Sequence, residues 1–276
     1  MNKLFATVAL AALFAAPAMA ADMPVKAPRY AVPPPVVTSW SGVYVGGHFG
    51  GGWGTKDWNQ TRVDVSVSGD LGNFFGPGTI FTNLPTAVTV DGFHGGIQGG
   101  YRFQSGIWVF GVEGSIAGAD IKGEAICFDL VCSSKIDWLA TLTGQVGLAL
   151  ERALLYVKGG AAWVHDKHTL AFATCLQGGD PGGTCTASSL STTRTGWLFG
   201  VGIAYAFDPR WSAFVEYNYM DFGKTNAVLT VTEVTAGGGG SFVETRTYDI
   251  HQNLHVVKAG VNFRFDLGGG PLVARY

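Results

Sequence analysis

The sequence is poor in charged residues and has no long apolar run after its first twenty residues. Asp, Glu, Lys and Arg make up 14% of the 276 residues, and the net charge is −2. A near-neutral chain offers no basic surface for nucleic acid, so we predict no nucleic-acid partner. No later stretch reaches the roughly 18 apolar residues of a transmembrane helix. If the mature chain enters a membrane, it must do so as a closed β-barrel.

Motifs for catalysis and metal binding are missing as well. We find no G-x-S-x-G, no zinc motif and no C-x-x-C-H for covalent haem. The glycine run 237–240 follows no strand and precedes no Gly-Lys-Ser/Thr, so it is not a phosphate loop. Glu113 and Glu216 could be imagined as an acid–base pair, and enzymes on outer-membrane barrels exist. We nevertheless predict no enzyme, no catalytic residue, no cofactor and no metal site.

The N-terminus has the pattern of a secretory signal peptide. Asn2 and Lys3 precede an apolar run, and Ala18-Met19-Ala20 forms a small-x-small cleavage site. A retained anchor helix is the alternative, but the run is short for a bilayer. We therefore predict a signal peptide over residues 1–20. Residues 21–39 contain five prolines and are predicted to form an extended periplasmic lead-in.

The rest of the chain is rich in glycine and aromatic residues, and its apolar residues recur with period two. The chain has 41 glycines and is 13% aromatic, which is unlike disordered chains. Eight segments alternate large apolar with small or polar residues, at the length of tilted membrane strands. These are residues 40–54, 92–103, 107–118, 136–150, 154–164, 196–207, 211–221 and 254–265. The pattern predicts an all-β fold: an eight-stranded, antiparallel, up-and-down transmembrane β-barrel over residues 40–265, followed by a tail, 266–276.

A soluble β-sandwich is the alternative, because its strands also alternate. Here the second face is mostly glycine and alanine with few charges, which suits a narrow barrel lumen. Tight turns at 104–106, 151–153 and 208–210 alternate with long links at about 55–91, 119–135, 165–195 and 222–253. Short turns at one end and long loops at the other are typical of outer-membrane barrels, whose long loops lie outside the cell.

The tryptophans support the barrel. Trp40, Trp108 and Trp211 fall at the lower ends of the predicted strands, Trp53, Trp138, Trp163 and Trp197 at the upper ends, and Trp58 in a loop. A membrane barrel needs two aromatic girdles because indole settles at the membrane interface, whereas a sandwich core has no such need.

Four charged residues on the inward face fall near the middle of the predicted barrel. They are Glu113, Lys158, Glu216 and Lys258, and Tyr44, Gln98 and Gln145 lie at similar heights. An eight-stranded ring is just wide enough for side chains to fill. We therefore predict a neutral charge layer that closes the lumen as a polar plug, held by ion pairing.

The four cysteines lie in predicted extracellular loops. An even number of cysteines in an exported protein suggests disulfides, with three possible pairings. We favour the local pairs Cys127–Cys132 and Cys175–Cys185, which close short loops. A zinc site is the rival interpretation, but the spacings are not those of a zinc motif.

Several motifs resemble those of the small alphaproteobacterial outer-membrane β-barrel porin family. They are the proline-rich lead after Ala21-Asp22, W-S-G-V-Y-V-G-G at 40–47, T-G-W-x-x-G-x-G-x-x-Y-A-F at 195–207, W-S-x-x-x-E-Y-x-Y-x-D-F-G at 211–223 and V-K-A-G-V-N-F-R-F at 257–265. The resemblance implies a barrel similar to the OmpA-type membrane domain, with roles in envelope integrity or surface contact. The sequence departs from the family pattern at Ala204, where a carboxylate is expected, and at Phe214, where Lys or Arg is common.

We predict a non-enzymatic outer-membrane protein with an envelope structural and surface-contact role through its loops. The alternatives are a narrow porin for small solutes or ions and a surface binder of hemin or a host molecule. Hemin binding rests on the family resemblance, and the six candidate histidines are 48, 94, 165, 168, 251 and 255. The expected partners are outer-membrane lipid, the barrel-assembly machinery and a possible surface ligand or host molecule.

Overall fold

The computed structural model describes residues 39–69, 77–127, 130–172, 184–234 and 240–265. The chain divides into two compact units, Met1–Val36 and Val37–Tyr276, and the described residues belong to the second. The predicted signal peptide, the lead-in up to residue 38 and the tail 266–276 lie outside the described residues. Within the described part, no helix is long and apolar enough to cross a membrane.

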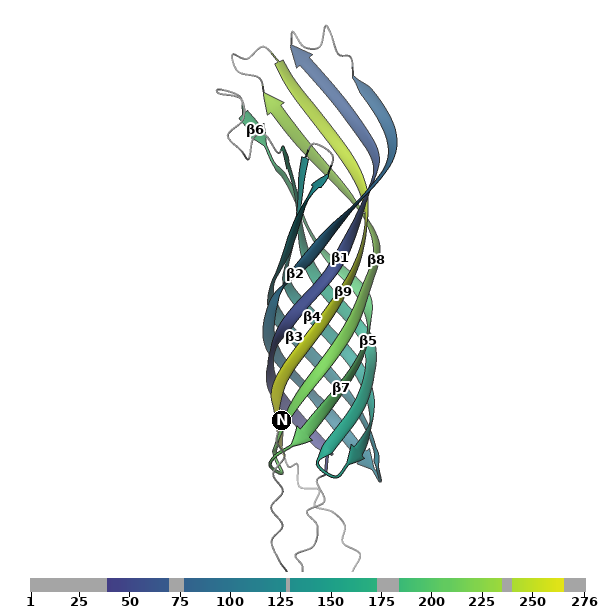
Figure 1. The fold of residues 1–276 in the computed structure, drawn as a ribbon, viewed down its shortest axis with the longest axis vertical. Coiled ribbons are helices and arrows are strands. Elements are labelled where there is room, and N and C mark those ends of the chain that lie inside the picture. The colour runs from purple at the N-terminus through teal and green to yellow at the C-terminus, as the bar shows by residue number, and fades with distance from the viewer. Residues whose placement is uncertain (1–38, 70–76, 128–129, 173–183, 235–239, 266–276) are drawn as a thin grey trace, which may run out of the picture. The chain divides into compact units, whose positions relative to one another are not determined.

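The described residues form nine strands, and eight of them close a ring (Figure 1). The strands are β1 (Gly42–Gly69), β2 (Gly78–Ser105), β3 (Trp108–Cys127), β4 (Leu130–Leu150), β5 (Ala153–Phe172), β6 (Thr184–Thr186), β7 (Ser188–Ala206), β8 (Trp211–Val234) and β9 (Gly240–Phe265). Every pairing is antiparallel, and β1 pairs with both β2 and β9. The short β6 lies outside the ring, paired with β8. This confirms the predicted eight-stranded up-and-down barrel.

The half of the ring next to the short turns carries large apolar side chains on its outer surface. Phe93 is 81% exposed, and Ile97, Val112 and Leu142 are all more than half exposed. Exposed aromatic residues border this zone, with Trp108 and Trp211 at the turn end and Trp53 and Trp197 at the other. We call this zone the belt, and it comprises residues 43–54, 92–103, 107–118, 138–150, 154–164, 196–207, 211–221 and 254–265. Its outer surface suits hydrocarbon, and its rims suit the membrane interfaces.

Beyond the belt, the strands continue through most of the segments predicted as long loops. Residues 55–69 and 78–91 extend β1 and β2, and the links predicted at 119–135, 165–195 and 222–253 are likewise mostly strand. The prediction of long irregular loops was therefore wrong. We call these continuing strand segments the extension, and Figure 1 shows that β1, β2, β8 and β9 run past the β3–β4 hairpin.

In the extension the ring separates into two sheets with an apolar core between them. The β2–β3 ladder ends at the pair Asp91–Lys122 and the β7–β8 ladder at Trp197–Asp221, which leaves the sheets β8-β9-β1-β2 and β3-β4-β5-β7. Their facing residues form one buried cluster, which includes Trp58, Val88, Val90, Ile121, Ile136, Val164, Leu170, Leu229, Tyr248 and Ile250. Large apolar side chains thus cover the outer surface of the belt, whereas in the extension most of them pack into an inner core, as the change from lipid to water favours.

Register shifts mark the boundary between belt and extension. They occur at Gly118/Ile121 in β3, at Ile136/Trp138 in β4 and at Asp221/Lys224 in β8. Such bulges add twist and are common at barrel rims. The bulge in β4 turns Asp137 to the outer surface, where it pairs with Lys135 and Lys167.

Two tryptophans lie elsewhere than predicted. Trp40 was assigned to the lower girdle but is 4% exposed, packed inside the ring near the turn end. Trp58 was assigned to a loop but lies in β1 and is fully buried in the core of the extension. In both cases the aromatic side chain fills the interior, which the spacing of tryptophans along the chain does not reveal.

Candidate functional site

The four predicted lumen charges lie together inside the belt. Lys158 Nζ is 3.0 Å from Glu113 Oε1 and 2.5 Å from Glu216 Oε1. Lys258 Nζ is 3.7 Å from Glu113 Oε1 and 3.3 Å from Glu216 Oε1. All four side chains are at most 5% exposed. Each ammonium group therefore faces both carboxylates, and the four charges balance within one layer, which we call the charge layer.

Two tyrosines donate hydrogen bonds to the second oxygen, Oε2, of these carboxylates. Tyr44 Oη donates to Glu113 Oε2 at 2.8 Å, and Tyr156 Oη donates to Glu216 Oε2 at 3.0 Å. In each case the tyrosine and the glutamate stand two strands apart, at the same register position, with a glycine between them. These are Gly100 for Tyr44 and Gly202 for Tyr156.

The intervening glycines are required by close approach. A Cβ atom on Gly202 would lie 2.5 Å from Cζ of Tyr156, and one on Gly100 would lie 2.8 Å from Oη of Tyr44. The tyrosine rings thus lie flat over the glycines and reach across the lumen to the carboxylates. Part of the glycine content that the sequence analysis ascribed to a narrow lumen has this specific role.

Amide and imidazole groups fill the lumen beside the charge layer. His48 Nδ1 lies 2.5 Å from Gln98 Oε1, and Gln98 Nε2 donates to Asn262 Oδ1 at 2.6 Å. Asn218 Nδ2 donates to Glu216 Oε1 at 2.7 Å. A neighbouring cavity, bordered by His94, measures only about 20 Å³, which is room for about one water molecule. The arrangement fills the lumen with polar side chains, many of them hydrogen-bonded to one another.

A second polar group in the interior was missed by the sequence analysis. Lys56 Nζ lies 2.7 Å from Asp166 Oδ1, and both side chains are fully buried in the extension. His168 Nδ1 lies 2.8 Å from Ser134 Oγ, and its ring packs edge-on against Trp58. These residues fall in segments predicted as loops, so their inward direction could not be inferred. The spacing of Lys56, Trp58 and Gln60 at every second residue could have indicated that β1 continues and that these side chains share one face.

The structure describes one of the two favoured cysteine pairs. Cys127 and Cys132 form a disulfide between the ends of β3 and β4, with their Cα atoms 5.8 Å apart. Both residues belong to strands and not to an irregular loop, because the β3–β4 hairpin continues to its tip. Cys175 lies outside the described residues, so the pairing with Cys185 stays a prediction.

The six histidines are spread over both surfaces of the sheet. His48, His94 and His168 are buried inside, whereas His165 and His255 stack on Trp138 and Trp53 at the rim of the belt and His251 lies within 4 Å of Asp57 and Asp221. Within the described ranges, no three His, Cys, Asp or Glu residues gather in a metal-binding group. The carboxylates of Glu113 and Glu216 are held by lysines and tyrosines, an arrangement that supports packing and not acid–base chemistry.

The fold and the lumen define a small outer-membrane barrel, and sequence comparison agrees. The chain belongs to the outer membrane protein beta-barrel domain family, whose model matches residues 6–265. It is an outer-membrane protein, and by the rule for such barrels the short turns face the periplasm and the extension faces outward.

Individual relatives fit this assignment. The chain is 32% identical over 272 residues to the 31 kDa outer-membrane immunogenic protein of Brucella melitensis, covering 93% of this chain and 97% of that protein. It is 27% identical over 217 residues to an uncharacterized protein of Coxiella burnetii, covering 71% and 78%. Among solved structures, it is similar to OprG from Pseudomonas aeruginosa, with 14% identity, 82% and 97% coverage and a TM-score of 0.42.

Proposed function

We propose that this protein is a non-enzymatic surface protein that binds an extended segment of a partner outside the cell by strand addition to β2. The closed barrel anchors it, and the extension presents the binding edge. The observation that carries the proposal is that residues 78–90 of β2 pair with β1 on one side, and with no strand on the other side within the described part of the chain.

The amino-acid composition of the β2 edge also favours pairing with another strand. Natural edge strands are usually blunted by charged side chains, yet residues 78–90 contain none. Ile80 is 58% exposed, Phe81 is 78% exposed and Leu84 is 39% exposed. Pro85 has no N–H donor, and Gly123 of β3 lies against the backbone of Thr89 and Val90. The backbone groups available for pairing are therefore those of residues 78–88 that point away from β1. An added strand would cover Ile80 and Leu84 on the inner face and Phe81 on the outer face.

The corresponding edge of β8 is covered instead. β6 pairs with residues 232–234, the Ser188 hydroxyl accepts from the Thr230 amide, and the Arg194 guanidinium donates to the carbonyls of Phe222 and Gly223. The contrast between the two edges of one sheet supports β2 as the contact edge.

The geometry of the barrel argues against a second copy in the same membrane as the partner. Barrel strands are tilted by about 35–45° from the membrane normal. Two copies related by an axis along the normal would cross their β2 strands at roughly twice that angle, and antiparallel pairing would not form. We therefore assign the edge to a segment that is free to align with it. The filled lumen argues against the narrow porin.

A peptide-binding experiment tests the proposal. The probe is a fluorescent eleven-residue peptide of alternating Thr and Val, with a lysine at each end. Its twin is N-methylated at every Thr and Val, so that neither edge of the strand keeps its N–H donors. With protein in lipid nanodiscs, we expect saturable binding of the probe by fluorescence anisotropy and at least tenfold weaker binding of the twin, because the twin lacks the N–H donors.

Variants separate the edge from general stickiness. The double variant Ile80→Lys with Leu84→Lys places charges along the edge and should weaken binding at least tenfold. Val228→Lys, which alters an exposed residue of β8 in the same sheet, is the control and should bind as the wild type does. Equal binding of the twin, equal loss in both variants, or no binding by the wild type would each refute strand addition.

A further inference from the structure

Among the described residues of the belt, one buried cation has no ion pair once the charge layer is paired. Glu113 and Glu216 both pair with Lys158 and Lys258, so two carboxylates balance two ammonium groups. Arg102 lies beside this layer and is only 3% exposed. Within the described residues its guanidinium has no ion pair, and its buried Nε has no acceptor. A buried charge without a partner is costly, so an anion bound beside Arg102 would stabilise the fold.

The aromatic groups around Arg102 do not supply that counter-charge. Its guanidinium lies 4.2 Å from the ring centre of Tyr44 and 5.8 Å from that of Tyr156. Aromatic faces attract a cation weakly and accept no strong hydrogen bond. Both tyrosine hydroxyls already donate to the carboxylates of the charge layer.

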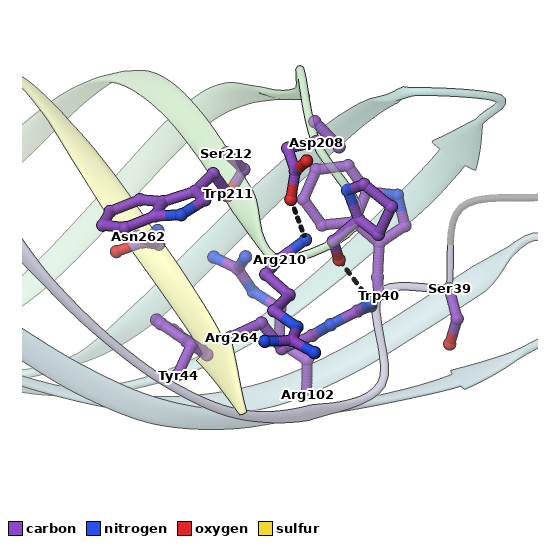
Figure 2. A pocket seen from close by; sticks show the side chains of 12 residues that line it. Ser39, Trp40, Tyr44, Arg102, Asp208, Arg210, Trp211, Ser212, Asn262 and Arg264 are labelled. Carbon is purple, nitrogen blue, oxygen red and sulfur yellow. Dashed lines mark hydrogen bonds between the residues drawn. The ribbon is translucent and has the colours of Figure 1, made fainter. Parts of the chain in front are cut away.

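A second buried donor lies at the same place. The Trp40 indole Nε1 is buried without an acceptor, and the Trp40 ring centre is 5.9 Å from the Arg102 guanidinium. Both residues line a cavity of about 20 Å³ at the turn end of the lumen. Figure 2 shows Arg210 and Arg264 among the labelled residues of this cavity, with Asp208, whose Oδ1 accepts from the Arg210 amide at 3.0 Å.

We propose that this cavity is a binding site for one small anion, held by the Arg102 guanidinium and the Trp40 indole N–H and reached from the periplasm. The volume admits a halide or one carboxylate end. Two orphaned donors call for a group that only accepts hydrogen bonds, and the buried charge of Arg102 calls for a negative one. A free inorganic anion and the terminal carboxylate of a periplasmic peptide share this chemistry.

Nuclear magnetic resonance on the full-length protein in micelles tests the site. The reporters are the Trp40 indole N–H and the Arg102 Nε–H, and the probes are sodium chloride and N-acetylalanine, with ionic strength held constant by a bulky sulfonate. We expect a saturable shift of both reporters with at least one probe. Saturation by chloride alone identifies an inorganic anion, and saturation by N-acetylalanine alone identifies a peptide carboxylate.

Two variants each remove one donor and leave the other as reporter. Arg102→Gln, followed at the Trp40 indole, should weaken binding at least tenfold, and Trp40→Phe, followed at the Arg102 Nε–H, about fivefold. Lys224→Gln removes a cation outside the cavity and should leave binding unchanged. If Arg102→Gln does not fold, judged by its heat-dependent mobility in SDS, Trp40→Phe decides alone. The proposal fails if neither probe shifts the wild-type reporters up to 0.5 M, or if Trp40→Phe binds as tightly as the wild type.

Discussion

At the residue scale, the sequence predicted which side chains of the belt point into the lumen, because these alternate along each strand. It did not predict which of them pair with one another. The inward positions of Glu113, Lys158, Glu216 and Lys258 follow from the period of two along each belt strand. That Arg102 has no ion pair among the described residues does not follow, because pairing depends on positions around the ring that one strand does not encode. The tyrosine contacts across Gly100 and Gly202 depend on register between three strands, which is equally hidden.

His168 gives the extension a dependence on pH. The pKa of His168 is lowered to about 4, mainly by burial and also by the positive charges of Lys56 and Arg194, while Asp166 opposes them. Because the folded pKa lies below the ordinary 6.5, the neutral ring stabilises the fold above pH 6.5. That stability is lost as the pH falls from 6.5 towards 4, by up to about 3 kcal/mol.

Hydrogen exchange of the extension amides, corrected for intrinsic rates, measures this effect. The protection of residues 130–137 and 165–172 should decrease over that pH window in the wild type. His168→Gln should remove the slope, and His165→Gln, at the exposed rim, should retain it. A slope that survives in His168→Gln would assign the pH dependence to another group.

At the element scale, the belt strands were predicted and their continuations were not. Inside the belt, large apolar residues alternate outward, and this pattern ends near Trp53 in β1 and Trp138 in β4. Beyond these points most large apolar residues point inward, and bulges interrupt the period of two. The membrane-strand pattern therefore ends there, and we predicted loops. Buried pairs such as Lys56 and Asp166 made these segments look polar.

The three-strand row Tyr156–Gly202–Glu216 predicts a glycine that cannot be replaced. In Gly202→Ala the new methyl group would overlap the Tyr156 ring, which must move and release Glu216. We expect a loss of about 1–3 kcal/mol in the free energy of unfolding, measured by urea titration in lipid vesicles. Gly144→Ala is the matched control, because a Cβ there meets no atom within 4 Å. Similar stabilities for the two variants would contradict this role for Gly202.

At the scale of the whole molecule, the charge layer blocks the lumen of the barrel. Every lumen carboxylate in it is shared by two lysines, so opening a path requires ion pairs to break in low-dielectric surroundings. The extension adds a second seal, since its apolar core lies directly in line with the lumen. Both features agree with the non-channel role proposed above.

Removing one carboxylate should expose the role of the layer. Glu216→Ala leaves two lysines facing Glu113 alone and should cost about 3 kcal/mol of stability in urea titrations. In planar bilayers we expect nearly silent wild-type protein and a measurable rise in conductance for the variant. Asp120→Ala, which removes a 60% exposed partner of Lys122, should change neither quantity appreciably. Steady, large currents from the wild type would favour the narrow porin instead.

The reversal of polarity between belt and extension constrains how such a chain can change in length over generations. A single residue inserted into or deleted from a strand exchanges the two faces of the strand from that point on. Apolar side chains would then face water, or charged side chains would face lipid. The bulges at Gly118/Ile121, Ile136/Trp138 and Asp221/Lys224 are places where such a step has already been absorbed. Length differences between relatives should therefore gather at the hairpin tips, at these bulges, or in steps of two residues.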